Sequence, residues 1–172
     1  MHTFEGDSAD QVWQKAASIF REPHDHPTQS SRDGDTGEIL HASFCIRHPR
    51  QRWVLSRRPS MNPAFAIAEI VWILRGRDDS AFLNFWNPRL PRFAGTGPKY
   101  DGAYGYRLRH QFTLDQLDRA YSALLSAPDS RQIVLQIWDP RTDLPDASGV
   151  PASADVPCNV CSLLKVRGGR LE

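Results

Sequence analysis

Helical spacing of apolar residues predicts three amphipathic helices in this chain. Each pattern begins at a polar capping residue and stops where a loop, a glycine or a proline interrupts it. The capping pairs are Ser8 with Gln11, Asn62 with Pro63, and Thr113 with Gln116, and the helices end near Arg21, Leu74 and Pro128.

Short runs rich in β-branched and aromatic residues, bounded by turn residues, predict the strands. We expect strands at residues 38–46, 52–56, 131–138 and 155–166. Gly168 and Gly169 form a two-residue hairpin turn, and residues 170–172 begin the return strand. Because a domain seldom ends inside a hairpin, we expect residues 1–172 to be a single, incomplete domain.

The second helix is apolar on nearly all sides, which predicts burial on most of its surface. Gly76 follows it as a C-terminal cap. Glu69 is the one carboxylate in its middle. A buried charge costs several kcal/mol unless it is paired. Glu69 therefore needs either a functional role or a partner such as a core arginine.

Composition places the chain among ordinary globular proteins. Its 172 residues are 40% apolar, which suffices for one core and excludes a disordered or fibrous chain. No apolar run approaches the roughly 20 residues of a membrane span, and the N-terminus is polar and acidic. Three cysteines are too few for a secreted disulfide framework. We expect a soluble, cytoplasmic protein whose cysteines are thiols.

The charged residues say little about the ligands of this protein. A formal net charge of +1 does not indicate a nucleic-acid partner, and we expect no DNA binding. The basic residues are nearly all arginine, since lysine occurs only at positions 15, 99 and 165. Guanidinium groups suit phosphate and carboxylate ligands, although the genome's codon bias explains the excess equally well.

Aromatic side chains gather between residues 79 and 106, where glycine and proline punctuate the chain. Such loop-rich aromatic segments commonly form ligand sites. We therefore expect this segment, which contains Trp86 and Tyr104, to form part of a site.

Four stretches carry the candidate chemistry. They are Glu-Ile-Val-Trp-Ile-Leu-Arg-Gly at 69–76, Gly-Ala-Tyr-Gly-Tyr-Arg-Leu-Arg at 102–109, Pro-Asp-Ser-Arg-Gln at 128–132, and Asp-Val-Pro-Cys-Asn at 155–159. In order and separation they resemble the motifs of the thymidylate synthase and deoxycytidylate hydroxymethylase family. The resemblance covers the chain from roughly Arg32 to its end.

The resemblance implies three catalytic residues. Cys158 matches the nucleophile of the family's Pro-Cys-His motif, and a thiolate is the attacking form of cysteine. Glu69 matches the carboxylate that organises water and protons at the pyrimidine ring, and Tyr104 matches the tyrosine placed against the reacting base. The alternatives are an inert buried cysteine, a paired glutamate and a packing tyrosine.

The resemblance also implies binding residues. Arg32 lies in an Arg-x-Gly loop like the family's phosphate loop, and Arg131 matches an arginine that reaches the phosphate of the partner subunit's nucleotide. The alternative for Arg131 is a strand-edge arginine in water. We assign Trp86 to folate contact.

The implied fold is α/β, with a thymidylate-synthase-like mixed sheet flanked by helices and a sheet face as the homodimer interface. The implied reaction transfers a one-carbon unit from 5,10-methylenetetrahydrofolate to C5 of a pyrimidine nucleoside monophosphate. Cys158 adds to C6, and C5 then attacks the methylene group. Hydride transfer from folate would give a methyl group, whereas capture of water would give a hydroxymethyl group.

The expected substrate is dUMP or a related nucleotide, as in thymidylate synthase. Arg107, Gln132 and Asn159 stand where thymidylate synthases usually have Gln, Arg and His, and these departures raise the alternative of a (d)CMP hydroxymethylase or a nucleoside-antibiotic pathway relative of the same family. A second alternative is a catalytically incomplete homologue that only binds nucleotide. A third is a zinc or redox module, because Cys158 and Cys161 have Cys-x-x-Cys spacing. The histidines show no metal-ligand spacing, and we predict no metal.

Overall fold

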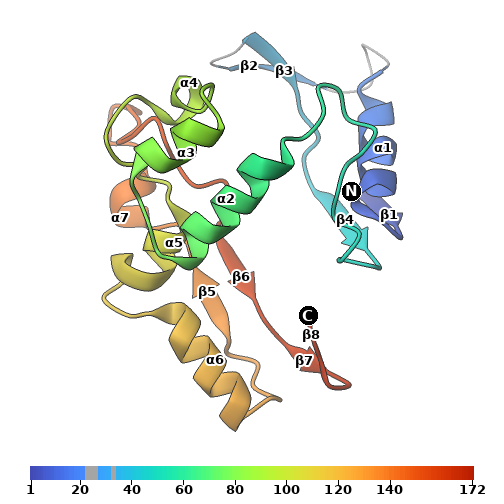
Figure 1. Cartoon of the computed structure of the whole chain (residues 1–172). Coiled ribbons are helices and arrows are strands. Elements are labelled where there is room, and N and C mark those ends of the chain that lie inside the picture. Colours follow the sequence, from blue (N-terminus) through green and yellow to red (C-terminus); the bar gives the residue numbers. More distant parts are fainter. Residues whose placement is uncertain (22–26, 32–33) are drawn as a thin grey trace. The chain divides into compact units, whose positions relative to one another are not determined.

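A computed structural model describes residues 1–21, 27–31 and 34–172 of the chain (Figure 1). It divides the chain into two compact units, Met1–Asn62 and Pro63–Glu172. The expected Arg32 lies outside the described residues. Within the described ranges, no helix has the length and apolar character that crossing a membrane requires.

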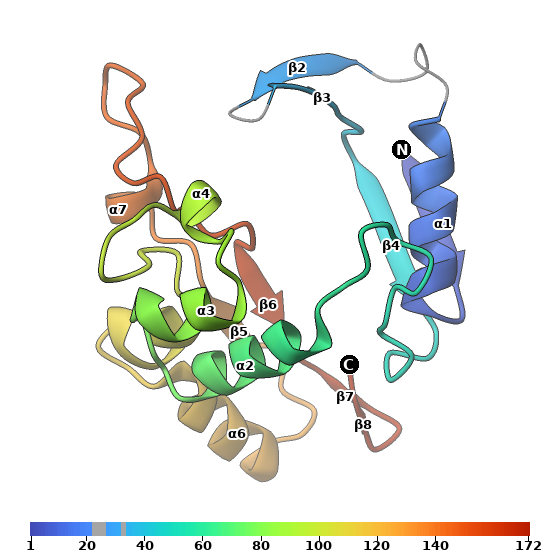
Figure 2. The same ribbon diagram turned by 45° about the horizontal axis from the view of Figure 1, so that its top comes forward.

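The first unit is built on a parallel pair of strands. Its elements are β1 (His2–Gly6), α1 (Ala9–Ile19), β2 (Thr28–Ser31), β3 (Gly34–Gly37) and β4 (Ala42–Ile46). Strand β1 pairs with β4 in parallel, and α1 packs along the pair (Figure 2). Phe4 and Val12 are buried, and the ring of Phe4 stacks on Phe44 at a centroid distance of 5.2 Å. Strands β2 and β3 form a separate antiparallel ladder.

The two residues of the predicted capping box, Ser8 and Gln11, both form hydrogen bonds at the start of the first helix. The Ser8 hydroxyl accepts a hydrogen bond from the Gln11 backbone N–H at 3.3 Å. The Gln11 side-chain oxygen accepts one from the Asp7 N–H at 2.8 Å. The first bond satisfies an amide group that the first helical turn leaves unpaired, and the second reaches the residue just before the N-cap. Together they confirm the predicted helix start.

The predicted strand at residues 52–56 is wrong, because this segment is irregular. Its end is tied to α1 by side-chain bonds instead of a ladder. The Ser56 N–H donates to one carboxylate oxygen of Asp10 at 2.7 Å, and the Ser56 hydroxyl donates to the other at 2.8 Å. A favourable strand composition does not make a strand where a side chain takes the backbone hydrogen bond.

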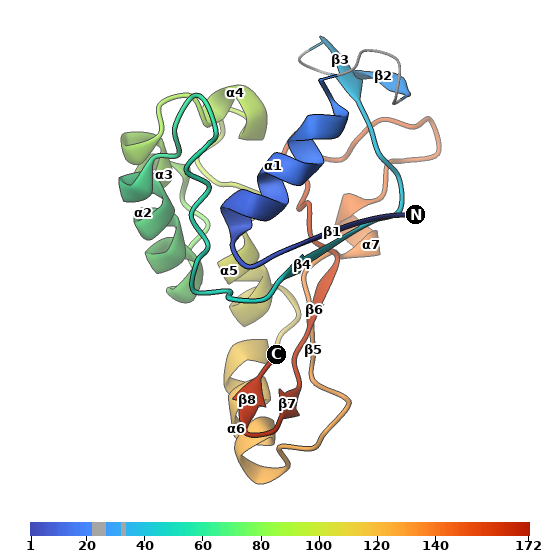
Figure 3. The same ribbon diagram turned by 90° about the vertical axis from the view of Figure 1, so that its right-hand side faces the viewer.

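The second unit combines short helices with short strands (Figure 3). Its helices are α2 (Pro63–Leu74), α3 (Ser80–Trp86), α4 (Pro91–Ala94), α5 (Tyr104–Tyr106), the π-helical turn η1 (Arg107–Gln111), α6 (Gln116–Ser126) and α7 (Pro140–Asp143). Its strands are β5 (Val134–Gln136), β6 (Cys161–Leu163), β7 (Val166–Arg167) and β8 (Arg170–Leu171).

Helix α2 is confirmed, with Gly76 after it at φ +66°, but its expected burial on most sides is wrong. Ala68 and Trp72 are buried. Four large apolar side chains on the helix are between 45% and 59% exposed: Ile67, Ile70, Val71 and Leu74. Apolar composition predicted burial, yet the described neighbours cover only one side of the helix.

The start of α6 differs from the prediction. Asp115, and not Thr113, is the N-cap, and its carboxylate accepts a hydrogen bond from the Asp118 N–H at 3.0 Å. Thr113 has a left-handed backbone at φ +56° and precedes the helix. Both residue types cap helices well, so local sequence did not distinguish them.

The chain mixes helices and strands, as an α/β fold requires, but its strands form four two-stranded ladders within the described residues. Strands β5 and β6 pair antiparallel over three residue pairs, so the strand predicted at 131–138 is shorter than expected. Strands β7 and β8 form the predicted hairpin. Gly168 and Gly169 turn it at φ +54° and +74°, values that glycine adopts without strain.

Two buried clusters form the core of the second unit. One joins η1, α6 and β5 through Leu108, Ala120, Ile133, Leu135 and Ile137. The other contains Trp72, Leu83, Tyr100 and Ala103. The second cluster lies directly under the pocket described next, so α2 and α3 serve as its foundation.

Candidate active site

A pocket with a volume of about 140 Å³ lies in the second unit. Residues from four stretches of chain line it: helix α2, residues 83–94, residues 100–104, and residues 155–158. The lining residues include Cys158, Tyr104 and Glu69, together with Asp155 and a wall of apolar side chains. The structure therefore brings together all three residues expected to be catalytic.

Cys158 lies at the exposed rim of this pocket. It was expected on a strand, which is wrong: the segment before β6 is irregular, and β6 begins only at Cys161. The Ile137 and Trp138 N–H groups both donate to the Val160 carbonyl at 3.0 Å. The ladder therefore stops at Val160 and does not reach Cys158. Pro157, the residue before Cys158, is buried and has no N–H to extend the ladder.

Tyr104 is fixed against the backbone of Cys158. Its hydroxyl oxygen accepts a hydrogen bond from the Cys158 N–H at 3.3 Å. Partial burial raises the pKa of Tyr104, and the hydrogen bond from Cys158 offsets only part of that effect. The phenol therefore keeps its proton at neutral pH, beside the candidate nucleophile.

Gly105 explains how Tyr104 comes to lie near helix α2. A Cβ atom at this position would be 2.1 Å from the Ile73 carbonyl oxygen and 2.6 Å from the Ile73 Cα. Only glycine permits such a close approach of two backbones. The Tyr-Gly pair of the second motif thus has a structural reason, since the glycine lets α5 touch the helix that carries Glu69.

Glu69 projects into the pocket from the middle of α2. Within the part of the chain that the structure describes, its carboxylate has no ion pair or hydrogen-bond partner. Burial raises the pKa of Glu69 above its ordinary value of 4.5. A partly buried, unpaired carboxyl group in a pocket is a candidate for proton transfer.

The pocket floor is rigid and aromatic. Trp72 is buried and donates its indole N–H to the Asp79 carbonyl at 3.0 Å. Tyr100 is also buried, and its hydroxyl hydrogen-bonds to the Asn84 side chain. Both aromatic residues satisfy their polar ends and present ring surface to the pocket, as a flat ligand ring requires.

Asp155 is a pocket residue that the sequence analysis did not single out as functional. One of its carboxylate oxygens accepts a hydrogen bond from the Gly102 N–H at 2.7 Å. Its own N–H donates to the Ser153 hydroxyl at 3.1 Å. The available signal was its place three residues before Cys158, inside the fourth motif.

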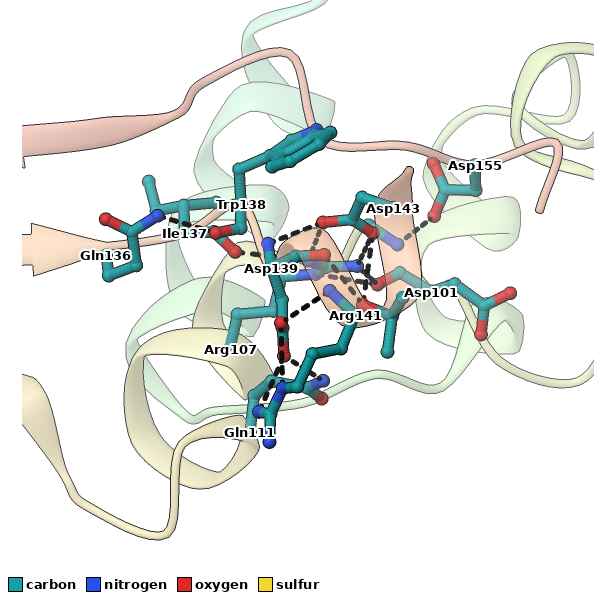
Figure 4. A network of polar contacts seen from close by, with 12 residues as sticks. Asp101, Arg107, Gln111, Gln136, Ile137, Trp138, Asp139, Arg141, Asp143 and Asp155 are labelled. Atoms are coloured by element: carbon teal, nitrogen blue, oxygen red, sulfur yellow. Dashed lines mark hydrogen bonds and ion pairs between the residues drawn. The ribbon is translucent and has the colours of Figure 1, made fainter. Parts of the chain in front are cut away.

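Arg107 is not among the residues that line this pocket, although it replaces a glutamine of the family motif. Its side chain is 3% exposed and pairs with Asp143 through two hydrogen bonds, of 2.6 and 2.8 Å. Its remaining donors bond to the Asp101 carbonyl at 2.6 and 2.8 Å and to the Ile137 carbonyl at 3.1 Å (Figure 4). Arg107 thus ties together three chain segments in the core.

Asp143 and Asp139 extend this network in α7 and just before it. Burial acts to raise the pKa of Asp143, but hydrogen bonds from Arg107 and from the Asp139 N–H outweigh it and lower that pKa. The side chain of Arg141 bonds to Asp139 at 2.9 Å and, with further hydrogen bonds, holds the pKa of Asp139 at about 2. Both aspartates are therefore ionised at neutral pH.

Two other expected site residues do not line the pocket. Arg131 is exposed before β5, and its side chain makes no ion pair or hydrogen bond within the described residues. Trp86 ends α3, is 38% exposed and packs edge-on against Phe85 at a ring-centroid distance of 5.1 Å. These two side chains could therefore contact only a part of a ligand that extends outside the pocket, or another segment of chain.

Cys161 begins β6, where it pairs with Gln136 of β5. Both cysteines of the Cys-x-x-Cys pair are free thiols. Among the described residues, no group of three or more His, Cys, Asp or Glu side chains is arranged to hold a metal ion.

The α/β architecture and the pocket define a class of site. A thiol, a phenol and two carboxyl groups line one pocket together with aromatic side chains, and covalent nucleophilic catalysis with proton transfer uses groups of these kinds. The family model for thymidylate synthase matches residues 18–172. The chain belongs to the thymidylate synthase family of enzymes.

Relatives with assigned names are similar to all or part of this chain. A deoxyuridylate hydroxymethyltransferase of Bacillus phage SP01 is 30% identical over all of this chain and 46% of its own length. One of Pseudomonas phage M6 is 32% identical over 72% of this chain and 34% of its own length. A protein of Methanothermobacter marburgensis, provisionally named a thymidylate synthase, is 41% identical over 40% of this chain and 27% of its own length. The chain spans less than half the length of these relatives.

Proposed function

We propose that this protein transfers a one-carbon unit to C5 of a pyrimidine nucleoside monophosphate, with Cys158 as the nucleophile. The observation that carries the proposal is the meeting of Cys158, Tyr104 and Glu69 in one pocket from three separate stretches of chain. Membership of the thymidylate synthase family supports the reaction type.

The pocket suits the reacting base better than a whole nucleotide. Pockets that enclose an entire small-molecule ligand measure roughly 300 to 1,000 Å³. At about 140 Å³, this one accommodates a single ring, with sugar and phosphate extending past its rim. Cys158, at the rim, is accessible for its sulfur to bond to C6 of that ring. Addition at C6 makes C5 electron-rich.

Tyr104 and Glu69 supply the proton movements. The Tyr104 hydroxyl is already held at the backbone of Cys158, so it lies beside the carbon that the sulfur attacks. Burial raises the pKa of Glu69, so its carboxyl group holds a proton more readily than an exposed glutamate and can exchange it with the ring through water.

The one-carbon unit would come from 5,10-methylenetetrahydrofolate, whose methylene group is attacked by C5. A pocket of about 140 Å³ that holds the base has no room for the flat heteroaromatic end of that molecule as well, so the folate would pack outside it. Trp86, which follows Leu83 at the end of the same helix, is the candidate for contact with the folate.

Phosphate binding is proposed for Arg131 and Arg32. Arg131 is exposed and has no partner among the described residues, so its guanidinium is available to an anion. In the proposed homodimer it would serve the nucleotide of the partner subunit, across a sheet face.

Two products are possible for this reaction, and the relatives favour one of them. The two phage relatives are named for hydroxymethyl transfer to deoxyuridylate, which supports a hydroxymethyl product and a uracil base. The alternatives are methyl transfer, as in thymidylate synthase itself, and hydroxymethylation of a cytosine nucleotide.

The test is mass spectrometry of the full gene product incubated with methylenetetrahydrofolate and 5-fluoro-dUMP, or separately 5-fluoro-dCMP. Fluorine at C5 blocks completion of the reaction, so the nucleotide and folate should remain attached to the protein. We expect an adduct on Cys158 with the uracil nucleotide and none in Cys158→Ala. Cys161→Ala, which changes the other thiol of the pair, should form the adduct as the wild type does.

Absence of an adduct with both nucleotides, in folded protein, would reject the enzyme hypothesis and leave a nucleotide-binding homologue. An adduct that persists in Cys158→Ala would move the nucleophile to another residue. Adduct with the cytosine nucleotide alone would change the substrate and keep the reaction type.

A further inference from the structure

Asp155 is the one pocket carboxylate without a task in the proposed reaction. It lines the same pocket as Cys158 and comes from the same segment, three residues earlier. Its side-chain oxygen is held by the Gly102 N–H at 2.7 Å and its backbone N–H by the Ser153 hydroxyl at 3.1 Å. These two bonds fix the carboxylate in the pocket wall, and Figure 4 shows it beside the Arg107 network.

Gly102 makes room for this carboxylate. A Cβ atom on Gly102 would lie 3.0 Å from Oδ1 of Asp155 and 3.1 Å from both Cγ and Oδ2. Contacts this short require one partner to move, because real Cβ atoms seldom approach so closely. The absence of a side chain at position 102 therefore determines where the Asp155 carboxylate sits.

Asp155 shares the pocket with a second tyrosine besides Tyr104. Tyr100 also lines the pocket, and the charge of Asp155 contributes to its raised pKa, after the larger effect of burial. A water molecule in a protein interior needs two to four polar partners. The Asp155 carboxylate and the Tyr100 hydroxyl oxygen both belong to residues that line the pocket, and they can provide such partners.

We propose that Asp155 directs a water molecule onto the one-carbon unit and thereby selects a hydroxymethyl product. The inference rests on the proposed function. It assigns to Asp155 the role of general base for water, while Tyr104 and Glu69 act on the ring.

The step balances without an oxidant or a reductant. Once the folate nitrogen has left, the nucleotide carries an exocyclic methylene double bonded to C5, with Cys158 sulfur on C6. The water oxygen bonds to the methylene carbon, one water proton passes to Asp155, and the electron pair of the double bond moves toward the C4 oxygen. That pair then re-forms the C5–C6 double bond as the C6–S bond breaks and thiolate leaves.

The test measures the product made from dUMP and methylenetetrahydrofolate in ¹⁸O-labelled water, with wild type and Asp155→Asn. We expect the wild type to form a hydroxymethyl nucleotide carrying one labelled oxygen. Loss of a general base typically costs 10²-fold to 10⁴-fold, so the Asn variant should form this product about 100-fold more slowly. Asparagine keeps an oxygen for the Gly102 N–H, which preserves the fold.

A second readout omits folate. Exchange of the C5 hydrogen of dUMP for solvent deuterium requires Cys158 to add to C6 but does not involve water attack on a methylene group. Asp155→Asn should keep the rate of this exchange within about threefold of the wild type, a tolerance that allows for small effects of a neighbouring substitution. The rate of labelled product formation should fall. Gly102→Ala should lower hydroxymethyl formation in the same selective way, by displacing the carboxylate. Asp101→Asn, an exposed aspartate outside the pocket, is the matched control.

The outcomes separate the two proposals. Hydroxymethyl formation at the wild-type rate in Asp155→Asn would overturn the inference and leave the proposed function in place. A wild type that makes only a methyl product would do the same, as would equal loss of exchange and product in Asp155→Asn. Absence of exchange and of product in the wild type would reject the proposed function itself.

Discussion

Two charged regions of the second unit handle ionisable groups in opposite ways. In the network around Arg107, the guanidinium makes five hydrogen bonds, two of them to the buried Asp143. In the pocket beside Cys158, the Glu69 carboxylate has no such partner within the described residues. A fully satisfied network holds chain segments together, whereas an unpaired carboxyl group remains available to a ligand.

The difference also appears in the pKa values. Hydrogen bonds hold the pKa of Asp139 at about 2, while burial raises the pKa of Glu69. The two carboxyl groups therefore make the free energy of unfolding depend on pH with opposite signs. The following substitutions test this contrast, beginning with the largest expected effect.

Arg107→Gln should strand Asp143 as a buried charge without its cation. Breaking a buried ion pair by removing one partner costs about 3 to 5 kcal/mol. Urea denaturation of the variant at pH 7 should show a loss of this size. The substitution introduces the residue usual in the family motif, so it tests whether this chain depends on its own pairing.

The double variant Arg107→Gln with Asp143→Asn is the matched control. It removes both charges, so it should be more stable than Arg107→Gln alone. A single variant as stable as the wild type would show that the ion pair contributes nothing to stability.

Gly105→Ala should disturb the contact between α5 and α2. The added Cβ would lie 2.1 Å from the Ile73 carbonyl oxygen, and both atoms belong to backbone. Overpacking costs about 1 to 3 kcal/mol, and sometimes more. We expect that loss in denaturation together with slower adduct formation at Cys158, because Tyr104 moves with α5. Gly97→Ala, where the nearest contact is 3.6 Å, should be close to neutral in both measurements.

Asp139→Asn should destabilise the protein at pH 7 by about 1 to 2 kcal/mol, as expected for hydrogen bonds to a charged group. The pKa of Asp139 falls from its ordinary 3.8 to about 2 on folding. Its stabilising contribution is therefore complete above pH 3.8 and is lost as the pH falls through about 2. Denaturation measured across this interval should show a shallower pH dependence in the variant; an unchanged slope would contradict the assignment.

Glu69→Gln should have the smallest effect on stability, and unlike the substitutions above it should stabilise the protein. A raised pKa means that the ionised carboxylate is disfavoured in the folded protein, so the variant should be more stable above pH 4.5, by on the order of 1 kcal/mol. The gain should vanish below pH 4.5, where the carboxyl group is protonated in both states. The same variant should lose turnover, which denaturation and product assays would measure side by side.

Local sequence predicted the features that depend on residues close together in the chain. The Ser8 N-cap, helix α2 with Gly76 after it, and the hairpin at Gly168 and Gly169 are all present. Each rests on hydrogen bonds or backbone conformations that span only a few residues. Where two equivalent caps competed, as Thr113 did with Asp115, local sequence chose the wrong one.

The motifs identified the family, and they named Cys158, Tyr104 and Glu69, which the fold then placed in one pocket. They marked Arg107 as a departure from the family motif but did not indicate its partner Asp143, which lies 36 residues further along the chain. They also passed over Asp155, whose hydrogen bond to Gly102 spans 53 residues.

The sequence by itself therefore determined the family, the three helices and the candidate nucleophile. Only the tertiary structure decided which carboxyl groups are paired and which face the pocket, which side of α2 is covered, and where the strand before Cys158 stops. The physical reason is that the burial and pairing of charges depend on segments distant in the chain, and local sequence patterns do not predict which distant segments come into contact.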